Sequence, residues 1–246
     1  MDPMPSNAEL YTALHRGSPG DLAFYRRLTK DADRVLELGC GYGRVLRGLG
    51  ERTGLVGMDI DPALLAMAER AVPAARLILG DMRRFDLDEV FDGVIIPYSG
   101  LYCLGSRQEL DELLGAVARH LTPRGFLAFD AWTADGFHAE GAAGTDEEDE
   151  LEPVTQLAIG SLLLDVLEKS RWRRDDQELL CTYVCRDGAH HREIRQRIRH
   201  RYFLRSELED ALGRVGFRGS WFGGFGSEPW DAFAEHTVVT AERQWK

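Results

Sequence analysis

The chain has 246 residues, 44% hydrophobic and 29% charged, which is the composition of a soluble globular protein with room for one large α/β domain and a modest insertion. Its formal net charge of −11 argues against a general nucleic-acid-binding protein, and no apolar run approaches the ~18 residues needed to cross a bilayer. The first residues lack the basic-then-apolar layout of a secretion signal, so we expect a cytoplasmic protein.

The four cysteines are too few and too scattered for a disulfide framework. Two of them, Cys181 and Cys185, lie near His190 and His191, so a zinc site has to be considered. Their spacing differs from that of a zinc knuckle, and the segment alternates polar and apolar residues as a strand does. We therefore predict no metal.

The first half of the chain alternates strand and helix patterns. Helices are predicted at 8–28, with a break at 17–20, and at 44–49, 63–71 and 107–121. Strands are predicted at 33–38, 54–59, 76–79, 91–97 and 126–130, with a turn at 122–125. Strands that alternate with helices at this pitch predict a doubly wound, mostly parallel sheet.

The pattern changes after Trp132. An acid-, glycine- and alanine-rich stretch at 139–153 predicts a mobile loop or lid. Three extended segments are then predicted at about 157–173, 179–186 and 191–204, joined by turns at 174–177 and 186–189. Ser206 is predicted to cap a helix over 207–215 that ends at Gly216, and 221–222 and 237–240 are predicted to close the sheet as an antiparallel hairpin.

The most informative segment follows the first predicted strand. Gly39, Gly41 and Gly43 stand at alternate positions between a strand pattern and a helix pattern. Such a turn lets a ligand approach bare backbone at the carboxyl end of the strand. The G-x-G-x-x-G fingerprint of dinucleotide-binding proteins lacks its last glycine here. The segment instead has the form E-x-G-x-G-x-G, with Glu37 at its head.

This motif resembles the first motif of the class I S-adenosylmethionine (SAM) dependent methyltransferases, and the resemblance covers about 33–130 and, more loosely, the C-terminal helix and hairpin. It implies SAM as the cofactor. With the strand and helix pattern it implies an α/β, doubly wound, mostly parallel seven-stranded sheet with a C-terminal antiparallel hairpin and an antiparallel sheet or lid inserted after the fifth strand. The expected parts are an N-terminal helical cap, a SAM-binding core, an acidic loop with the antiparallel insertion, and the last helix with the closing hairpin: 1–32, 33–138, 139–204 and 205–246.

Further positions match this family at the expected distances. Asp59 ends the second predicted strand, where a carboxylate accepts from both ribose hydroxyls; the alternative role, a helix cap, already suits Asp61. Asp81 and Met82 are similar to the adenine-binding position, and Glu37 is expected to act indirectly, near the methionine end. The resemblance implies nine cofactor-binding residues: Glu37, Gly39, Cys40, Gly41, Asp59, Ile60, Asp81, Met82 and Pro97.

The methyl acceptor is expected beyond the carboxyl ends of the strands. Tyr98 and Tyr102 follow the fourth strand and are candidates for lining the methyl-transfer site, although one of the two is equally a core residue. After the fifth strand, Asp130, Trp132 and His138 are expected to face the same region. His138 is the candidate general base, and a solvated loop histidine is the alternative. A base is needed only when the nucleophile arrives protonated.

Two further patterns leave alternatives open. Tyr11 and His15 lie four residues apart on one helix face, which in relatives folds over the cofactor, while exposure to solvent is an equal alternative for His15. The segment 195–201 has arginine at every second position, so the four guanidinium groups share one strand face. That face is an anion site, a partner surface, or an exposed face neutralised by the acidic residues of 146–152; the third is favoured.

We therefore expect a SAM-dependent methyltransferase that transfers a methyl group, by in-line displacement, to a nitrogen or oxygen of a small molecule. The antiparallel insertion resembles that of the glycine and amino-sugar N-methyltransferase-like branch, where it covers the acceptor site and often builds a dimer contact, so a homodimer is an open option. Two alternatives remain. A macromolecular methyltransferase, acting on tRNA or protein, would dock through Arg195–Arg201, and a non-catalytic SAM-binding partner protein would bind cofactor without turnover.

Overall fold

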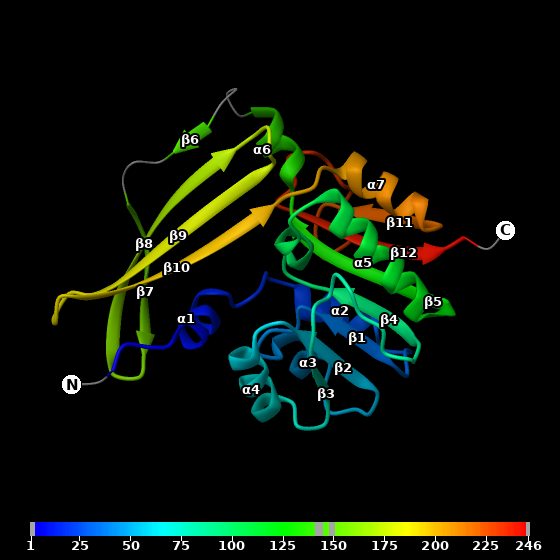
Figure 1. The fold of residues 1–246 in the computed structure, drawn as a ribbon, viewed down its shortest axis with the longest axis horizontal. Coiled ribbons are helices and arrows are strands. Elements are labelled where there is room, and N and C mark those ends of the chain that lie inside the picture. Colours follow the sequence, from blue (N-terminus) through cyan, green and yellow to red (C-terminus); the bar gives the residue numbers. More distant parts are fainter. Residues whose placement is uncertain (1–2, 141–144, 148–150, 245–246) are drawn as a thin grey trace. The chain divides into compact units, whose positions relative to one another are not determined.

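The structure is a computed structural model that describes residues 3–140, 145–147 and 151–244 (Figure 1). It divides into two compact units. The core unit comprises Gly17–Ala139 and Phe203–Lys246, and the insert unit comprises Met1–Arg16 and Glu140–Tyr202. The finer division into four parts, at residues 32, 138 and 204, stays a prediction. Within the described residues, no helix is long and apolar enough to span a membrane.

A seven-stranded sheet in the order β11-β12-β5-β4-β1-β2-β3 forms the centre of the core unit. Its strands are β1 (Val35–Leu38), β2 (Leu55–Asp59), β3 (Arg76–Leu79), β4 (Phe91–Ile96), β5 (Leu121–Trp132), β11 (Phe217–Phe222) and β12 (His236–Arg243). Neighbouring strands among β5, β4, β1, β2 and β3 pair in parallel, whereas β12 is antiparallel to β5 and to β11. The doubly wound sheet with a C-terminal hairpin is thereby confirmed.

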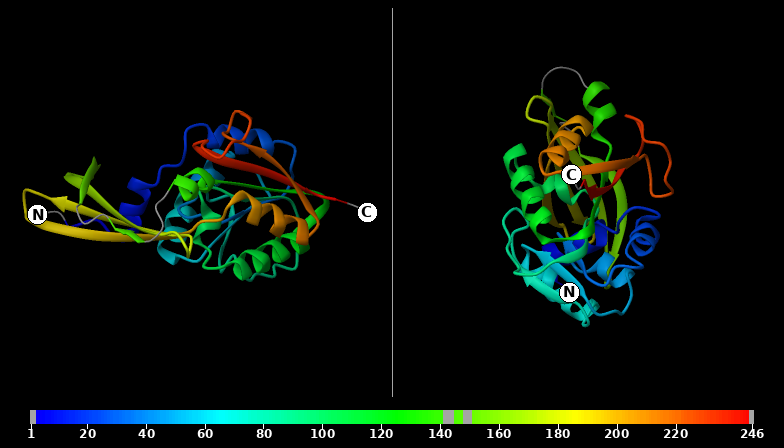
Figure 2. Two further views of the ribbon diagram at one scale, coloured as in Figure 1. Left: turned by 90° about the horizontal axis from the view of Figure 1, so that it is seen from above. Right: turned by 90° about the vertical axis from the view of Figure 1, so that its right-hand side faces the viewer.

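Helices cover both faces of this sheet, with α5 and α7 side by side on one of them (Figure 2). The helices of the core unit and the 3-10 helix η1 are α2 (Asp21–Leu28), α3 (Arg44–Gly48), α4 (Pro62–Ala71), η1 (Gly100–Cys103), α5 (Arg107–His120), α6 (Ala134–Glu140) and α7 (Arg205–Arg214). All four residues of β1 and five of the six in β4 are buried, as expected for parallel strands covered on both faces.

The predicted end signals of two helices had different outcomes. Asp61 caps α4 as expected, because its carboxylate accepts from the backbone N–H groups of Ala63 and Leu64. The predicted cap at Ser206 was wrong, since α7 begins one residue earlier, at Arg205. There the Glu207 carboxylate accepts from the backbone N–H of Leu204 at 2.9 Å, so a glutamate and not the Ser206 hydroxyl is the side-chain acceptor at the start of the helix.

The turn predicted at 122–125 was also wrong, because these residues continue β5. Phe91 pairs with Leu121, but Gly93 pairs with Phe126, so the register shifts by three residues inside the strand. The proline and glycine that signal a turn are accommodated in this irregularity instead. Only a residue without a side chain fits at position 125, because a Cβ on Gly125 would stand 3.0 Å from the carbonyl oxygen of Phe91.

The insert unit is a five-stranded antiparallel sheet with one helix. Strand β8 pairs with β6, β7 and β9, and β9 pairs with β10. Its elements are α1 (Asn7–Leu14), β6 (Thr145–Glu147), β7 (Glu152–Ile159), β8 (Leu162–Arg173), β9 (Glu178–Asp187) and β10 (Arg192–Arg201). The extended segment predicted at 157–173 is therefore two strands, which turn at Gly160 with its positive φ of 59°.

The acid-rich stretch predicted as a loop is partly strand. Residues 145–147 pair with β8, and Glu152 and Pro153 belong to β7, so backbone pairing overrides a composition that disfavours strands. Residues 141–144 and 148–150 of this stretch lie outside the described residues.

Helix α1 completes the core of the insert unit. Leu10 packs in a buried cluster with Leu164, Val166 and Cys185, which alternate along the strands and so project from one face of the sheet. His15, at the C-terminal end of α1, has its ring centroid 4.5 Å from that of Tyr11 and 6.0 Å from that of Tyr183, and burial lowers its pKa to about 4. These contacts favour packing over solvent exposure for His15.

Candidate functional site

The glycine turn between β1 and α3 presents bare backbone to open space. Gly39, Gly41 and Gly43 all have positive φ, at 71°, 52° and 77°, where an ordinary side chain is strained. A Cβ at Gly39 or Gly41 would meet no atom within 4 Å, whereas one at Gly43 would stand 3.0 Å from Val72 and 3.2 Å from Ala68. The first two glycines thus leave room for a ligand, and the third allows the turn to pack on α4.

Asp59, at the end of β2, holds this turn in place. One carboxylate oxygen accepts from the N–H of Gly41 at 2.7 Å, and the other accepts from the N–H of Asp61 at 2.9 Å. A carboxylate oxygen accepts about two hydrogen bonds, so each keeps capacity for one more. The half-buried Asp59 can therefore accept from a pair of hydroxyls while it fixes the glycine turn, which fits the ribose role predicted for it.

Glu37 is a buried acid with an unsatisfied oxygen, two residues before the turn. Glu37 is only 3% exposed, and its Oε2 has no hydrogen-bond donor in the part of the chain that the structure describes. Burial raises the pKa of Glu37 to about 8, and the Arg44 charge opposes that rise. An orphaned carboxylate oxygen of this kind is satisfied when a ligand supplies a cation or an N–H donor.

A buried ion pair that the sequence analysis missed lies behind the turn. The guanidinium of Arg44, the first residue of α3, bonds to the carboxylate of Asp21 at 2.5 Å, and the two side chains are 12% and 4% exposed. The same guanidinium lies 5.7 Å from the ring centroid of Tyr98. The ion pair joins α2 to α3. In the sequence, only the position of Arg44 beside the third glycine of the turn indicated a role for either residue.

Asp81 and Met82, predicted to meet adenine, follow β3, and the predicted cofactor residue Ile60 follows β2. Ile60 and Leu79 keep 65% and 63% of their surface exposed, and Leu79 is the register partner of Asp59 on the neighbouring strand. Two large exposed apolar side chains at adjacent strand ends suit an aromatic base. Asp81 is already paired, because hydrogen bonds from Arg83 lower its pKa. An adenine amine would share this carboxylate with Arg83.

The structure separates the two tyrosines that the sequence left undecided. Tyr102 is 1% exposed, and its hydroxyl donates to the backbone carbonyl oxygens of Trp132 at 3.0 Å and Phe203 at 3.3 Å. Its ring also packs edge-on against the Trp132 ring, with centroids 5.1 Å apart. These contacts support a packing role for Tyr102 over contact with a substrate.

Tyr98 is half-buried and is held by a hydrogen-bond network. Its backbone N–H donates to both carboxylate oxygens of Asp130, at 3.0 and 3.1 Å, and Asp130 also accepts from the Tyr25 hydroxyl at 2.6 Å. Tyr98 and Ser99 have positive φ values of 55° and 58°, which are unusual for residues with side chains and need such support. Burial raises the pKa of Asp130 to about 6, while the Tyr25 bond opposes the rise.

The remaining predicted residues lie in several elements of the core unit. His138 is half-buried on α6, a helix rather than the loop expected for it. Cys40 and Pro97 are buried, Met82 is half-buried, and Asp130 lies 2% exposed behind the Tyr98 backbone instead of facing an acceptor. The structure thus brings Glu37, Gly41 and Asp59 together. Tyr25, missed as a site residue, could not be paired with Asp130 from the sequence.

Among the described residues there is no cluster of three or more His, Cys, Asp or Glu side chains that could hold a metal ion. Of the residues weighed for zinc, Cys185 is buried in the core of the insert unit, and His190 bonds to Asp187 at 2.8 Å.

Residues 35–125 match a protein family described as "Methyltransferase domain". The chain is 35% identical over 151 residues to dTDP-3-amino-3,6-dideoxy-alpha-D-glucopyranose N,N-dimethyltransferase of Streptomyces fradiae, covering 57% of this chain and 59% of the relative. It is 28% identical over 149 residues to dTDP-3-amino-3,4,6-trideoxy-alpha-D-glucopyranose N,N-dimethyltransferase of Streptomyces venezuelae, covering 57% and 63%. The chain thus spans about three fifths of the length of these relatives.

Solved structures share the fold over nearly the whole chain. The CcbJ methyltransferase of Streptomyces caelestis superposes with a TM-score of 0.77 at 19% identity, covering 99% of this chain and all of that one. SAM-bound CalS10, an amino pentose methyltransferase of Micromonospora echinaspora, superposes with a TM-score of 0.71 at 23% identity, again over 99% and 100%. At these identities the likeness shows the fold, including the antiparallel insertion.

Proposed function

Because residues 35–125 match the methyltransferase domain family, we propose that the protein is a class I SAM-dependent methyltransferase that transfers a methyl group from SAM to a nitrogen of a small molecule. The observation that carries the proposal is the glycine turn, with two positive-φ glycines that face open space and with Asp59 bonded to its backbone. An open turn tied to an acid at the next strand end is built to hold a nucleoside with a charged tail.

The residues of the core unit fit SAM part by part. Gly39 and Gly41 give the methionine portion access to the backbone, and the orphaned Oε2 of Glu37 is an acceptor for the amino group of the ligand, whose positive charge favours release of the proton that burial holds on this carboxyl. Asp59 has capacity for both ribose hydroxyls. Ile60 provides an exposed apolar surface for the adenine ring, and Asp81 accepts from its exocyclic amine.

When bound, SAM supplies a methyl carbon that is electrophilic because it is attached to a sulfonium. The protein then has to align the acceptor's lone pair with that carbon, opposite sulfur, and to exclude water. The network of Tyr25 and Asp130 serves this alignment because it fixes the backbone of Tyr98. Tyr98 thereby presents an oxygen and a ring face at the carboxyl end of β4.

An amino sugar is the acceptor class that we propose. The two Streptomyces relatives act on amino sugars linked to dTDP, and the amino pentose methyltransferase shares the fold with this chain. An amine that arrives as an ammonium ion must lose a proton before it attacks, and His138 is the candidate base for that step. A free amine needs no base.

Other parts of the proposal concern location and partners. We propose a cytoplasmic protein that acts without a membrane or nucleic acid and that assembles, if at all, with a second copy of itself. A macromolecular methyltransferase would instead show product formation that falls steeply with salt, because phosphate contacts release counterions. A non-catalytic SAM-binding protein would bind cofactor and form no product.

Calorimetry with SAM and with its demethylated product tests cofactor binding. We expect both to bind the wild-type chain and Asp59→Ala to weaken both, because the variant loses the ribose acceptor and the tie to Gly41. Asp86→Ala removes an exposed acid in the connection between β3 and β4, so it is the matched control and should bind as wild type. Failure of wild type to bind either compound, or unchanged binding by Asp59→Ala, contradicts the cofactor assignment.

Turnover is tested separately, with labelled SAM and a panel of amino sugars, with and without a dTDP group, beside the matching hydroxy sugars. Label transferred to an amine and not to its hydroxyl counterpart supports N-methylation. Label found only in tRNA or protein favours the macromolecular alternative.

A further inference from the structure

One face of the insert sheet carries a group of cations, which we call the basic face: Lys169, Arg171, Arg195, Arg197 and Arg199. Register pairs Lys169 of β8 with Thr182 of β9, and Thr182 with Arg197 of β10, so these three side chains form one row across three strands. Since side chains alternate along a strand, this row projects from the face opposite to the one that α1 covers.

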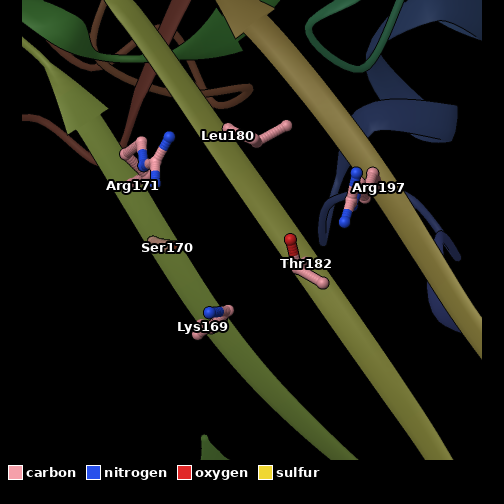
Figure 3. Close-up of a pocket in the computed structure, with 6 residues that line it drawn as sticks. All are labelled: Lys169, Ser170, Arg171, Leu180, Thr182 and Arg197. Carbon is pink, nitrogen blue, oxygen red and sulfur yellow. The ribbon is translucent and has the colours of Figure 1, made fainter. Parts of the chain in front are cut away.

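The row opens into a hollow of about 170 Å³ on the sheet surface (Figure 3). Its lining residues are Lys169, Ser170, Arg171, Leu180, Thr182 and Arg197. A hollow of this volume holds several waters, so it has room for a small oxyanion. Three of the six lining side chains are cationic, and none is acidic.

The ends of the basic face are neutralised, and its middle is not. The Arg195 guanidinium bonds to Glu193 at 2.8 Å, and that of Arg199 bonds to Glu178. Carboxylates on β10 and β9 are thus the partners of these two arginines, whereas most acidic side chains of 146–152 lie outside the described residues, so their predicted neutralisation of this face stays a prediction. Among the side chains described in 3–140 and 151–244, neither Lys169 nor Arg197 has an ion-pair partner. Two uncompensated cations thus flank Thr182, in a chain whose net charge is −11.

We propose that Lys169, Thr182 and Arg197 bind the phosphate group of a small phosphorylated molecule. A planar guanidinium donates two parallel hydrogen bonds to a phosphate, an ammonium adds a point charge, and a hydroxyl donates one more bond. On either side of this row, Arg195 and Arg199 are already paired with Glu193 and Glu178, so the uncompensated positive charge is confined to the hollow. It therefore matches a compact anion better than an extended polyanion such as RNA.

All residues of this site belong to the insert unit, so its test is separate from the test of SAM binding. Titration of the full chain with inorganic phosphate at low ionic strength, followed by calorimetry, tests it directly. We expect saturable binding that Arg197→Gln weakens about tenfold or more, since a charge-assisted bond is lost. Lys169→Gln should weaken it as well, and Arg197→Lys should restore part of the affinity.

Arg195→Gln is the matched control. It removes the same charge from the same strand face, but from a guanidinium that Glu193 already occupies, so phosphate affinity should stay within about twofold of wild type. Circular dichroism and melting of each variant show that the sheet is intact. Unchanged SAM binding by Arg197→Gln is expected, and a failure of the wild type to bind SAM would leave the phosphate result standing.

Three outcomes overturn the proposal. If the wild-type chain shows no saturable phosphate binding up to roughly ten millimolar, the site is excluded. Equal losses in Arg195→Gln and Arg197→Gln show diffuse charge attraction instead of a site. Tighter binding of a single-stranded RNA than of phosphate, dependent on Arg197, assigns the basic face to a nucleic acid.

Discussion

The core unit and the insert unit use charged residues in opposite ways. In the core unit, Asp21 and Arg44 form an ion pair that is almost fully buried, and Asp130 is buried between Tyr25 and the Tyr98 backbone. In the insert unit, arginines of β10 form ion pairs on an exposed sheet face. Burial decides what a charge contributes, because a buried ion that loses its partner has no water to replace it. Substitutions should therefore have large effects in the first region and small effects in the second.

Asp21→Ala should have the largest effect. It leaves the buried Arg44 guanidinium without its main partner, and we expect a loss of about 3–5 kcal/mol in the free energy of unfolding. Chemical denaturation measures this loss. Asp111→Ala, which breaks an exposed ion pair with Arg214, is the matched control and should cost about 1 kcal/mol or less. Equal losses of unfolding free energy in both variants would show that the buried ion pair contributes no more to stability than the exposed one.

Glu37→Gln should change how stability depends on pH. The folded-state pKa of Glu37, about 8, lies above its ordinary value of 4.5, so between these values the folded chain holds a proton that the unfolded chain has released. Stability contributed by that proton is present below pH 4.5 and is lost as the pH rises toward 8, at about 1.4 kcal/mol per pH unit. The variant lacks this loss.

Denaturation of the ligand-free chain at pH 5, 6.5 and 8 measures the difference. The stability of Glu37→Gln relative to wild type should rise steadily across this range. Glu235→Gln, an exposed acid of the same unit, should run parallel to wild type. Parallel curves for Glu37→Gln would mean that its carboxyl is not held protonated by burial.

Gly41→Ala should have an intermediate effect on stability and a larger one on the cofactor. The positive φ of 52° strains an alanine by about 1–2 kcal/mol, and its methyl group enters the open space that we assign to SAM. Gly213→Ala, in the last turn of α7 with no atom near its Cβ, should instead stabilise the protein by about 0.5–1 kcal/mol. Calorimetry should show weaker SAM binding for Gly41→Ala alone.

Arg195→Ala should have the smallest effect. Its pair with Glu193 is exposed, so the free energy of unfolding should change by about 0.5 kcal/mol or less, and added salt should remove even that. A loss above 2 kcal/mol would show that the basic face contributes to the stability of the insert unit.

Local patterns in the sequence were sufficient for the core sheet and its cofactor turn. Alternating strands and helices, the three glycines and the Asp61-Pro62 cap each act within a few residues, and the structure has the elements that they predict. The sequence pattern gave a wrong prediction where turn-forming residues lie within a strand. The Pro-Arg-Gly segment after Thr122 has the residues of a turn but lies within β5, between the pairing of Leu121 with Phe91 and that of Phe126 with Gly93.

Contacts between distant residues had no signal in the sequence. Tyr25 and Asp130 stand 105 positions apart, and each reads by itself as an ordinary core tyrosine or a strand-end acid. Only the three-dimensional fold brings the hydroxyl to the carboxylate. The choice between Tyr98 and Tyr102 likewise depended on which side chain the fold buries.

The division of the chain has a consequence for how such a protein is recombined or redesigned. The insert unit is assembled from two separate stretches, residues 1–16 and 140–202, and Leu10 from the first packs on Leu164 and Val166 from the second. A graft of 140–202 alone onto another scaffold would expose the apolar face that α1 covers, and removal of the first stretch alone would do the same. The two stretches therefore form one exchangeable module, which has to be moved, truncated or diversified together.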